Sequence, residues 1–444
     1  MKEIVLKELQ KATKDYEVYL QTTEINEVHI QKNRINFINK TFDSGYGIRV
    51  LTKGLGFSSS NVNSTQAVRK TISDALKSSR MIEKVKFQFP SQKPFSRVKN
   101  IDKKIKNNGE GAVRDYVAQL LNSIPSDILL SFGKVRSYDS HVQIINSEGL
   151  DLEREETNFM LELSIIIKKN GKKVEFWPHE YRRRIEDLPV SNIQEWIRIA
   201  QDQLIAKQPR TERTTVIFSP STVLDGLGSV LGFHATGAAK VNDVSKFLIG
   251  DRIASEDLTI ISDGLYPFGL MTSGFDDEGV PQRRIPLIEK GEFKNFVYDQ
   301  FYGLKDETES TGNGLRQSDV FYIFDSKFAS TPGNQVSNFY VEPGNKSFDE
   351  LIEEVKHGVL VKSFSWLNPD ATTGKFSSEI RAGYYIENGE LASPIKGGLV
   401  AGDFFELIKN ISGISNESTI CSGGTILAGV CPYIRFDNVQ VAGR

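Results

Sequence analysis

The chain has 444 residues, of which 39% are apolar and 25% charged, and its formal net charge is −2. This composition is typical of an ordinary globular protein that is long enough for two separate cores. The near-neutral charge argues against a protein that binds nucleic acid through bulk electrostatics.

The sequence gives no sign of a membrane segment or of a disulfide framework. No apolar stretch approaches the roughly 20 residues of a membrane-spanning helix, and the first residues lack the apolar core of a signal peptide. The two cysteines, Cys421 and Cys431, favour reduced thiols, with a single disulfide as the alternative for a hyperthermophile. We therefore expect a cytoplasmic protein with no membrane partner.

The first part of the chain alternates between helical and strand-like patterns. An amphipathic helix is expected over residues 3–20. Alternating apolar residues then predict strand segments within 28–38 on either side of a turn at Asn33, and a further strand pair over 46–57. Ser64 is placed to cap a further helix. The polar, proline-containing stretch 84–109 has few apolar residues and is expected to be a connection.

A second helix-and-strand unit is expected from Gly111 onwards. Asn170-Gly171 predicts a tight hairpin turn between two of its strands. The polar stretch 207–214 is the best domain boundary in the sequence. We therefore expect an N-terminal α/β region over 1–210, with 1–83 and 111–207 as candidate sub-units.

The remainder, 211–444, has a different character. Glycine-rich turns separate short apolar segments, which is typical of antiparallel β structure. Helices are expected only over 221–240, 347–357 and 402–411. The whole chain is best described as α+β, an N-terminal α/β region followed by a β-rich, mostly antiparallel domain.

Four segments of this second half, taken in order and spacing, resemble the TldD/PmbA family, also called modulators of DNA gyrase. The segments are 275–291, 298–316, 339–352 and 373–390, and the chain also ends in the family-like 439–443. The resemblance implies a metalloprotease-like C-terminal domain and dimers that enclose a cavity. The catalytic branch of the family carries a His-Glu-x-x-x-His helix that binds zinc, with a C-terminal cysteine as a further ligand.

This chain lacks that motif. Aligning on Gly237 puts Phe233 and Ala238 at the two histidine positions and His234 at the position of the glutamate. Hydrocarbon side chains have no lone pair for a metal, whereas zinc needs about three protein ligands. We therefore expect no metal, no cofactor and no catalytic residue of the family's type.

His234 and Cys421 are the remaining candidates for metal ligands. A buried, hydrogen-bonded histidine is the favoured interpretation of His234, with a lone zinc ligand as the alternative. Cys421 falls near the place of the family's cysteine, and a small, partly buried thiol is favoured there.

Five polar residues in the retained segments are candidates for binding substrate. Two arginines could hold a peptide carboxylate through planar guanidinium donors. The structural alternative is that the retained residues shape turns, or that Arg283 and Arg284 form buried pairs with Asp276, Asp277 or Asp299. The candidates are Arg283, Arg284, Asp299, Asn313 and Arg316. Strand addition at an open sheet edge is another way to bind an unfolded peptide.

The basic cluster 182–184 is expected on a solvent-facing strand or in a subunit contact, because the overall charge does not support direct nucleic-acid binding.

The leading hypothesis is a non-catalytic subunit of a TldD/PmbA-type metallopeptidase complex that acts on unfolded peptides. Its partner would be a catalytic TldD-like homologue, or a second copy in a homodimer. The alternatives are a metallopeptidase with atypical ligands, such as His234 and Cys421, and a peptide-binding homodimer without peptidase activity. The family's link to DNA gyrase implies an indirect effect at most.

Overall fold

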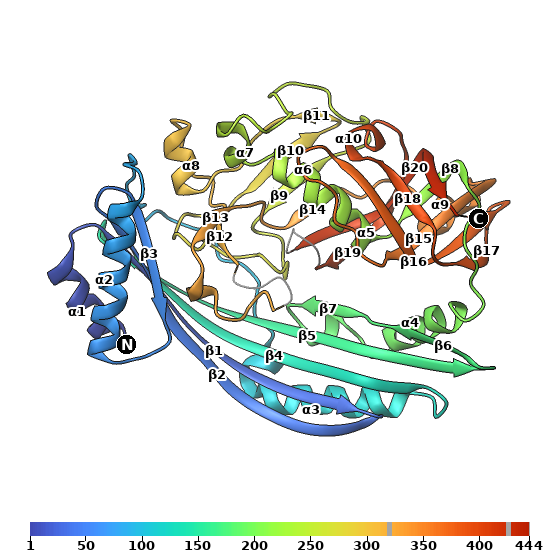
Figure 1. Cartoon of the computed structure of the whole chain (residues 1–444), viewed down its shortest axis with the longest axis horizontal. Coiled ribbons are helices and arrows are strands. Elements are labelled where there is room, and N and C mark those ends of the chain that lie inside the picture. The colour runs from blue at the N-terminus through green and yellow to red at the C-terminus, as the bar shows by residue number, and fades with distance from the viewer. Residues whose placement is uncertain (318–321, 423–427, 444) are drawn as a thin grey trace.

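The computed structural model describes residues 1–317, 322–422 and 428–443. Two large sheets form most of this structure (Figure 1). The first has seven strands in the order β3-β2-β1-β4-β5-β6, with β7 also paired to β5. These strands are β1 (Tyr16–Gln31), β2 (Arg34–Leu51), β3 (Leu55–Ser60), β4 (Leu129–Asn146), β5 (Asp151–Lys169), β6 (Lys172–Phe176) and β7 (His179–Arg182).

Helices cover one face of this sheet, and the second half of the chain covers the other. Successive side chains of a strand point to opposite faces, so each strand contributes to both contacts. On β1, Val18 and Val28 join the cores beneath the helices, while Tyr19 and Ile25 point the other way and pack on the second half of the chain. The helices are α1 (Lys2–Ala12), α2 (Thr65–Met81), α3 (Lys103–Ser123) and α4 (Asn192–Asp202), with a short turn η1 (Ile185–Asp187). The first sheet is thus buried on both faces.

The second sheet has eleven strands in the order β11-β10-β9-β14-β20-β18-β16-β15-β8, with β17 beside β16 and β19 beside β20. The strands are β8 (Glu212–Phe218), β9 (Ile260–Asp263), β10 (Arg284–Glu289), β11 (Glu292–Phe293), β14 (Phe339–Val341), β15 (His357–Phe364), β16 (Lys375–Glu387), β17 (Glu390–Ile395), β18 (Leu399–Asp403), β19 (Ile411–Cys421) and β20 (Gly429–Ala442).

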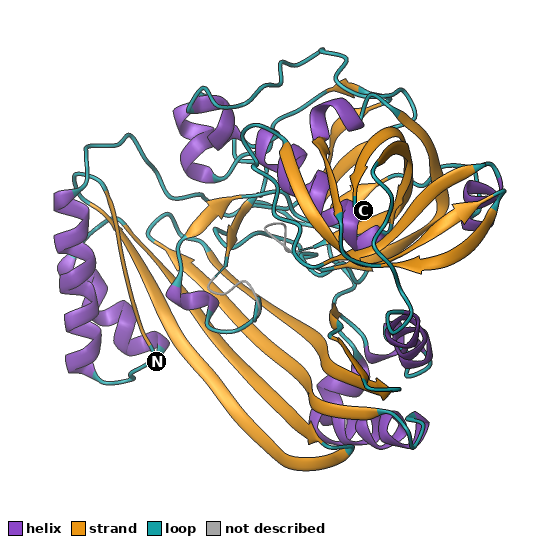
Figure 2. Cartoon of the chain, turned by 45° about the vertical axis from the view of Figure 1, so that its right-hand side comes forward, coloured by secondary structure: helices purple, strands orange, loops and turns teal. Residues whose placement is uncertain are grey.

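Because β20 also pairs with β8, five of these strands close into a ring (Figure 2). Its interior is filled by aromatic side chains that meet edge to face around Phe218, including Phe364, Phe404 and Phe436. Most pairings are antiparallel; β8 with β15 and β14 with β20 are parallel. The α+β class predicted from sequence is confirmed.

Short elements connect the strands of the second unit. They are α5 (Pro220–Val223), the π-turn η2 (Leu224–Gly228), α6 (Ser229–His234), α7 (Gly237–Val241), α8 (Gln300–Lys305), η3 (Lys327–Ala329), α9 (Phe348–Glu353), α10 (Phe404–Leu407) and the ribbon β12 (Gly314–Arg316) with β13 (Pro332–Asn334). No helix in the described part of the chain has the length and apolar character needed to cross a membrane.

Two predicted hairpin turns are present. At both turns, two consecutive residues have positive φ: Lys32 and Asn33 in the first, and Asn170 and Gly171 in the second. This is the backbone of a type I′ turn, which asparagine and glycine tolerate best. The two candidate sub-units, 1–83 and 111–207, share one sheet, because β1 lies between β2 and β4.

Several predicted helix limits are wrong. The first helix, expected over 3–20, ends at Ala12, and Tyr16 already starts β1. The helices expected over 347–357 and 402–411 are shorter than predicted. They are α9, with 6 residues, and α10, with 4 residues, and both are flanked by strands. Apolar residues at mixed spacing fit a helix or a strand equally well over such short windows, and pairing in the sheet decides.

The stretch 84–109 is more than a connection. Phe87 and Phe89 are buried and lie against the guanidinium of Arg49, and α3 begins at Lys103. The helix expected over 221–240 is interrupted, since α6 ends at His234 and α7 starts only at Gly237.

Candidate functional site

The segment 229–241 holds the residues that align with the metal-binding helix. Thr236 begins α7 as its cap, and its Oγ1 accepts a hydrogen bond from the Ala239 backbone N–H at 3.1 Å. The helix is broken between the end of α6 at His234 and the start of α7 at Gly237. Phe233 and Ala238 lie on either side of this break, and both are partly exposed. The break brings a phenyl ring and a methyl group to the surface where the family resemblance places two imidazoles.

His234 points inward and is fully buried. Its Nδ1 accepts a hydrogen bond from the Lys246 backbone N–H at 3.1 Å, and the ring is surrounded by Phe233, Phe247 and Phe405. Burial lowers the pKa of His234. The buried, hydrogen-bonded role predicted for this histidine is confirmed, and its acceptor nitrogen is already in use.

Cys421 is also buried, and burial raises the pKa of its thiol far above the usual range. The thiol donates to the Thr419 carbonyl at 3.2 Å. Cys421 lies opposite Gly429 and Thr419 lies opposite Cys431 in the β19–β20 pair, and both cysteines are free. A neutral, buried thiol is a poor metal ligand, because metals bind the thiolate.

This set of residues does not fit a zinc site. Two of the aligned positions are hydrocarbon, His234 is turned inward, and the Cys421 thiol is held in its neutral form. Within residues 1–317, 322–422 and 428–443, no three His, Cys, Asp or Glu side chains are grouped so that they could hold a metal ion.

Asp225, in the π-turn η2, was not predicted from sequence. Its Oδ1 is buried and has no hydrogen-bond partner among the residues that the structure describes. Burial, followed by the charge of Glu180, raises the pKa of Asp225 to about 7. The one sequence signal for a buried carboxylate here is that Asp225 stands between the apolar Leu224 and Leu227.

The two predicted arginines at β10 are on the surface. Arg283 is exposed. Arg284 is half-exposed, lies over the ring of Tyr340 and forms weak ion pairs with Asp263 and Glu342. The expected buried pairs of these arginines with Asp276, Asp277 or Asp299 are wrong, because both arginines are exposed whereas the three carboxylates are buried, and Asp277 pairs with Arg154 and Lys327 instead.

The other three predicted residues are buried. Asn313 donates to the Gln335 carbonyl at 2.8 Å and to two serine hydroxyls. Arg316 pairs with Glu17 at 2.9 Å. Asp299 caps α8 by accepting from the Tyr302 backbone N–H at 2.7 Å. The structure thus separates the five candidates into an exposed pair and three residues inside the molecule.

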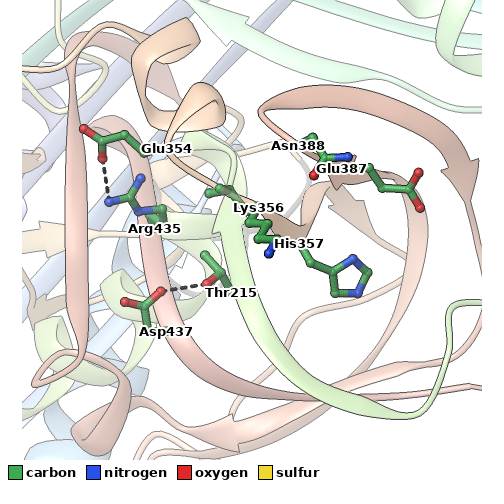
Figure 3. A pocket seen from close by; sticks show the side chains of 9 residues that line it. Thr215, Glu354, Lys356, His357, Glu387, Asn388, Arg435 and Asp437 are labelled. Carbon is green, nitrogen blue, oxygen red and sulfur yellow. Dashed lines mark hydrogen bonds and ion pairs between the residues drawn. The ribbon is translucent and has the colours of Figure 1, made fainter.

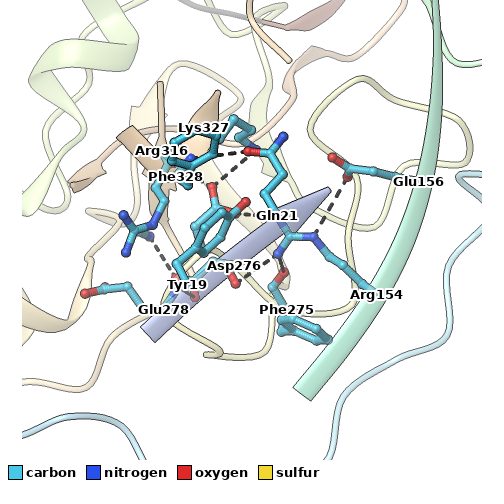
Figure 4. Close-up of polar contacts among 12 residues, drawn as sticks. Tyr19, Gln21, Arg154, Glu156, Phe275, Asp276, Glu278, Arg316, Lys327 and Phe328 are labelled. Atoms are coloured by element: carbon cyan, nitrogen blue, oxygen red, sulfur yellow. Dashed lines mark hydrogen bonds and ion pairs between the residues drawn. The ribbon is translucent and has the colours of Figure 1, made fainter. Parts of the chain in front are cut away.

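A buried ionic network joins the two halves of the chain, and Figure 4 shows the part of it around Arg154, Glu156 and Lys327. Glu17 of β1 accepts from Arg49 of β2 and from Arg316 of β12. Arg49 also donates to Glu278 at 2.8 Å. A second cluster joins Arg154 of β5 with Asp277, and Lys327 lies 3.3 Å from the same carboxylate.

The predicted solvent-facing position of the basic cluster 182–184 is wrong for two of its three arginines, whereas the third, Arg184, is partly exposed and pairs with Asp187. Arg182 and Arg183 are buried. Arg183 donates to the carbonyls of Gly269, Leu270 and Thr272, and also faces Glu156. Backbone carbonyls of a distant loop satisfy this guanidinium, which sequence spacing could not reveal.

A surface groove of about 700 Å³ lies beside β8, β20 and the start of β15 (Figure 3). Some of its charged groups are paired, Arg435 with Glu354 at 2.8 Å and Asp437 with the Thr215 hydroxyl at 2.8 Å, whereas Lys356 and Glu387 are exposed at its rim. No residue of the segment 229–241 lines this groove, and we do not regard it as the functional site.

Comparison with known proteins relates both halves of the chain to one family. Residues 211–443 match the PmbA/TldA metallopeptidase C-terminal domain, and residues 16–79 match PmbA/TldA metallopeptidase domain 1. A metalloprotease of Methanocaldococcus jannaschii is 26% identical over 428 residues, covering 92% of this chain and 91% of the relative. A zinc metalloprotease TldD homolog of Saccharolobus solfataricus is 24% identical over 94% of each chain.

Solved structures share the fold over the full length. TldE from Thermococcus kodakarensis superposes with a TM-score of 0.87 at 23% identity, covering 100% of both chains. A putative modulator of DNA gyrase from Thermotoga maritima gives 0.81 at 20% identity, covering 99% of this chain and 100% of the other.

Proposed function

This chain belongs to the TldD/PmbA family of metallopeptidase-like proteins, and we propose that it is a non-catalytic subunit of a metallopeptidase complex that acts on unfolded peptides. The observation that carries the proposal is the pair Phe233 and Ala238 at the positions of the family's two zinc histidines. Neither side chain has a lone pair to donate.

The neighbouring donors do not replace these ligands. A displaced centre would need His234 to turn out of its aromatic pocket and release the Lys246 N–H. It would also need the Cys421 thiol to ionise while buried. Both changes oppose the packing of the folded chain, which favours the subunit role over a metallopeptidase with atypical ligands.

An exposed strand edge supports the existence of a partner subunit. β3 pairs with β2 only from Tyr46 onwards, so residues 34–43 of β2 have no strand on their outer side in the described structure. Ile35, Phe37 and Phe42 are exposed there, at 44%, 45% and 64%. Apolar side chains on an open edge are what a subunit contact would cover.

We place substrate binding at the exposed pair Arg283 and Arg284. Arg284 is the first residue of β10 and Arg283 directly precedes it, and Arg284 keeps about half of its surface free despite its contacts with Glu342 and Asp263. A planar guanidinium can hold a peptide carboxylate through two parallel hydrogen bonds. We also propose that the complex works in the cytoplasm, since both cysteines are free thiols.

The subunit role is tested by purifying the native protein from its source together with whatever binds it. We expect a homologous second chain that carries an intact His-Glu-x-x-x-His helix. The isolated chain should leave a denatured protein substrate such as casein uncut, and the reconstituted pair should cleave it in a chelator-sensitive manner.

Chelator-sensitive cleavage by the isolated chain that is lost in His234→Ala would establish the atypical metallopeptidase instead. Purification of a pure homodimer with no peptidase activity would favour the peptide-binding alternative.

A further inference from the structure

A cavity of about 290 Å³ lies where the first unit meets the second. Arg49 and Phe57 line it from β2 and β3, and Glu278, Asp299 and Phe301 line it from the second unit. Figure 1 shows α8, which Asp299 caps, on the same side of the molecule as α2 and β3. The cavity thus combines buried charges with aromatic walls. It adjoins the segment 229–241, because Asn334 in its lining accepts a hydrogen bond from the Ala238 backbone N–H.

The charges that surround this cavity do not balance. Glu17 bonds both Arg49 and Arg316, and Arg49 also bonds Glu278, so two cations and two carboxylates neutralise one another. Asp299 is a further carboxylate and is only 4% exposed. A buried charge without a counterion is strongly unfavourable unless a cation or a proton joins it.

Asp299 also has an unused acceptor. Its Oδ1 accepts from the Tyr302 backbone N–H at 2.7 Å, whereas no donor in the described chain bonds its Oδ2. Nearby Asp276, equally buried, is satisfied by three backbone N–H groups, those of Glu278, Val280 and Gly314. The fold therefore gives Asp276 all of its hydrogen-bond donors, whereas one oxygen of Asp299 remains without a donor at the cavity.

We infer that this cavity binds a primary ammonium group carried on a short apolar stem. The ammonium would donate to Asp299 Oδ2 and lie beside Glu278, and the stem would pack against Phe57 and Phe301. Aromatic rings attract a cation as well as an apolar chain, and three N–H donors match the geometry of carboxylate oxygens. The inference depends on this cavity alone and not on the proposed subunit role.

Other ligands fit less well. An anion would face the surplus carboxylate. A divalent metal ion would find two side-chain carboxylates at most, and Glu278 already bonds Arg49 and the Gln300 N–H. The real competitor is a proton, because burial and the charge of Glu278 raise the pKa of Asp299 to about 7.

Titration calorimetry of the full chain with n-butylammonium chloride at pH 8 tests the inference. We expect saturable binding of n-butylammonium and none of n-butanol, which has the same stem without the charge. Affinity should rise between pH 6 and pH 8 in the unmodified protein, because Asp299 loses its proton over this range while the amine stays charged.

Asp299→Asn should weaken binding at least tenfold. Asparagine also caps helices well, so α8 should persist in this variant. Glu309→Gln is the matched control, since it removes a nearby carboxylate that is 74% exposed and lies outside the cavity. Equal binding by the Asp299 variant, equal binding of n-butanol, or no binding at all would each overturn the inference.

Two further ligands distinguish the biological sources of the ammonium. Leucine amide offers an α-ammonium beside an apolar side chain, as a peptide amino terminus does. Nα-acetyl-lysine methylamide offers only a side-chain ammonium. Whichever competes with n-butylammonium identifies the source, and competition by neither would contradict a role for the cavity in binding peptides.

Discussion

Gly237 shows how a single residue fixes the backbone of the segment that aligns with the metal-binding helix. Its N–H donates to the Val297 carbonyl at 2.7 Å, and an added Cβ would overlap the ring of Tyr298. Gly237→Ala should therefore destabilise the protein by about 1–3 kcal/mol through overpacking. Urea unfolding measures this change.

Gly333→Ala is the control for that substitution, because the nearest atom to its added Cβ is 3.6 Å away. We expect less than about 0.5 kcal/mol for this variant. Equal unfolding midpoints for the two variants would show that Tyr298 yields to the methyl group.

Asp225 should make stability depend on pH. Its folded pKa is raised to about 7 from an ordinary value of 3.8, chiefly by burial and then by Glu180. Between these values the folded chain holds a proton that the unfolded chain releases, so stability falls as pH rises, by up to about 1.4 kcal/mol per pH unit.

Asp225→Asn removes this titration. Relative to the unmodified protein, the variant should gain stability steadily from pH 4.5 to pH 7 and no further above it, as followed by urea unfolding at each pH. Parallel pH profiles for the two proteins would mean that Asp225 ionises normally in the fold.

For single residues, the sequence predicts the properties that depend only on the chemistry of the side chain. That Phe233 and Ala238 cannot bind a metal follows from their chemistry, and no coordinates are needed. The partner of His234, the backbone of Lys246, lies twelve positions away across a loop, and the burial of Asn313 depends on contacts made only in the fold. Such facts cannot be derived from local pattern.

Elements were predictable where a local signal was unambiguous. Asn170-Gly171 marked a hairpin because those residues tolerate positive φ, and Ser64 capped α2 as expected. The stretch 16–20 was assigned to a helix, yet Tyr16 pairs with Val50 in the sheet. Its conformation is decided by a strand some thirty residues away.

The contact between β1, β2 and β12 gives a prediction at the level of elements. Glu17 is fully buried and is bonded by Arg49 and Arg316. Glu17→Gln leaves Arg316 without a counterion, and removing one partner of a buried pair destabilises by about 3–5 kcal/mol. The urea midpoint should fall accordingly.

Lys2→Ala provides a comparison within the same chain, because it breaks an exposed ion pair with Asp151 whose side chains are 40% and 52% exposed. Such pairs contribute about 0–1 kcal/mol. If Glu17→Gln were no more damaging than Lys2→Ala, the network would not hold the two units together.

On the scale of the whole molecule, charge pairs link residues far apart in the sequence. Arg49 meets Glu278, and Arg154 meets Asp277. Sequence reasoning recognised the change from an α/β region to a β-rich region but treated the two as separate. It missed that Asp277 and Glu278 are satisfied by arginines of the first sheet, because nothing local links them.

The central claim is that the inherited zinc site of this chain has lost its ligands. The most direct test is the zinc content of the purified chain after exposure to excess zinc and removal of free metal, measured by mass spectrometry of the element. The account predicts well below one zinc per chain, with no change in His234→Ala or Cys421→Ser. About one zinc per chain that disappears in either variant would contradict it.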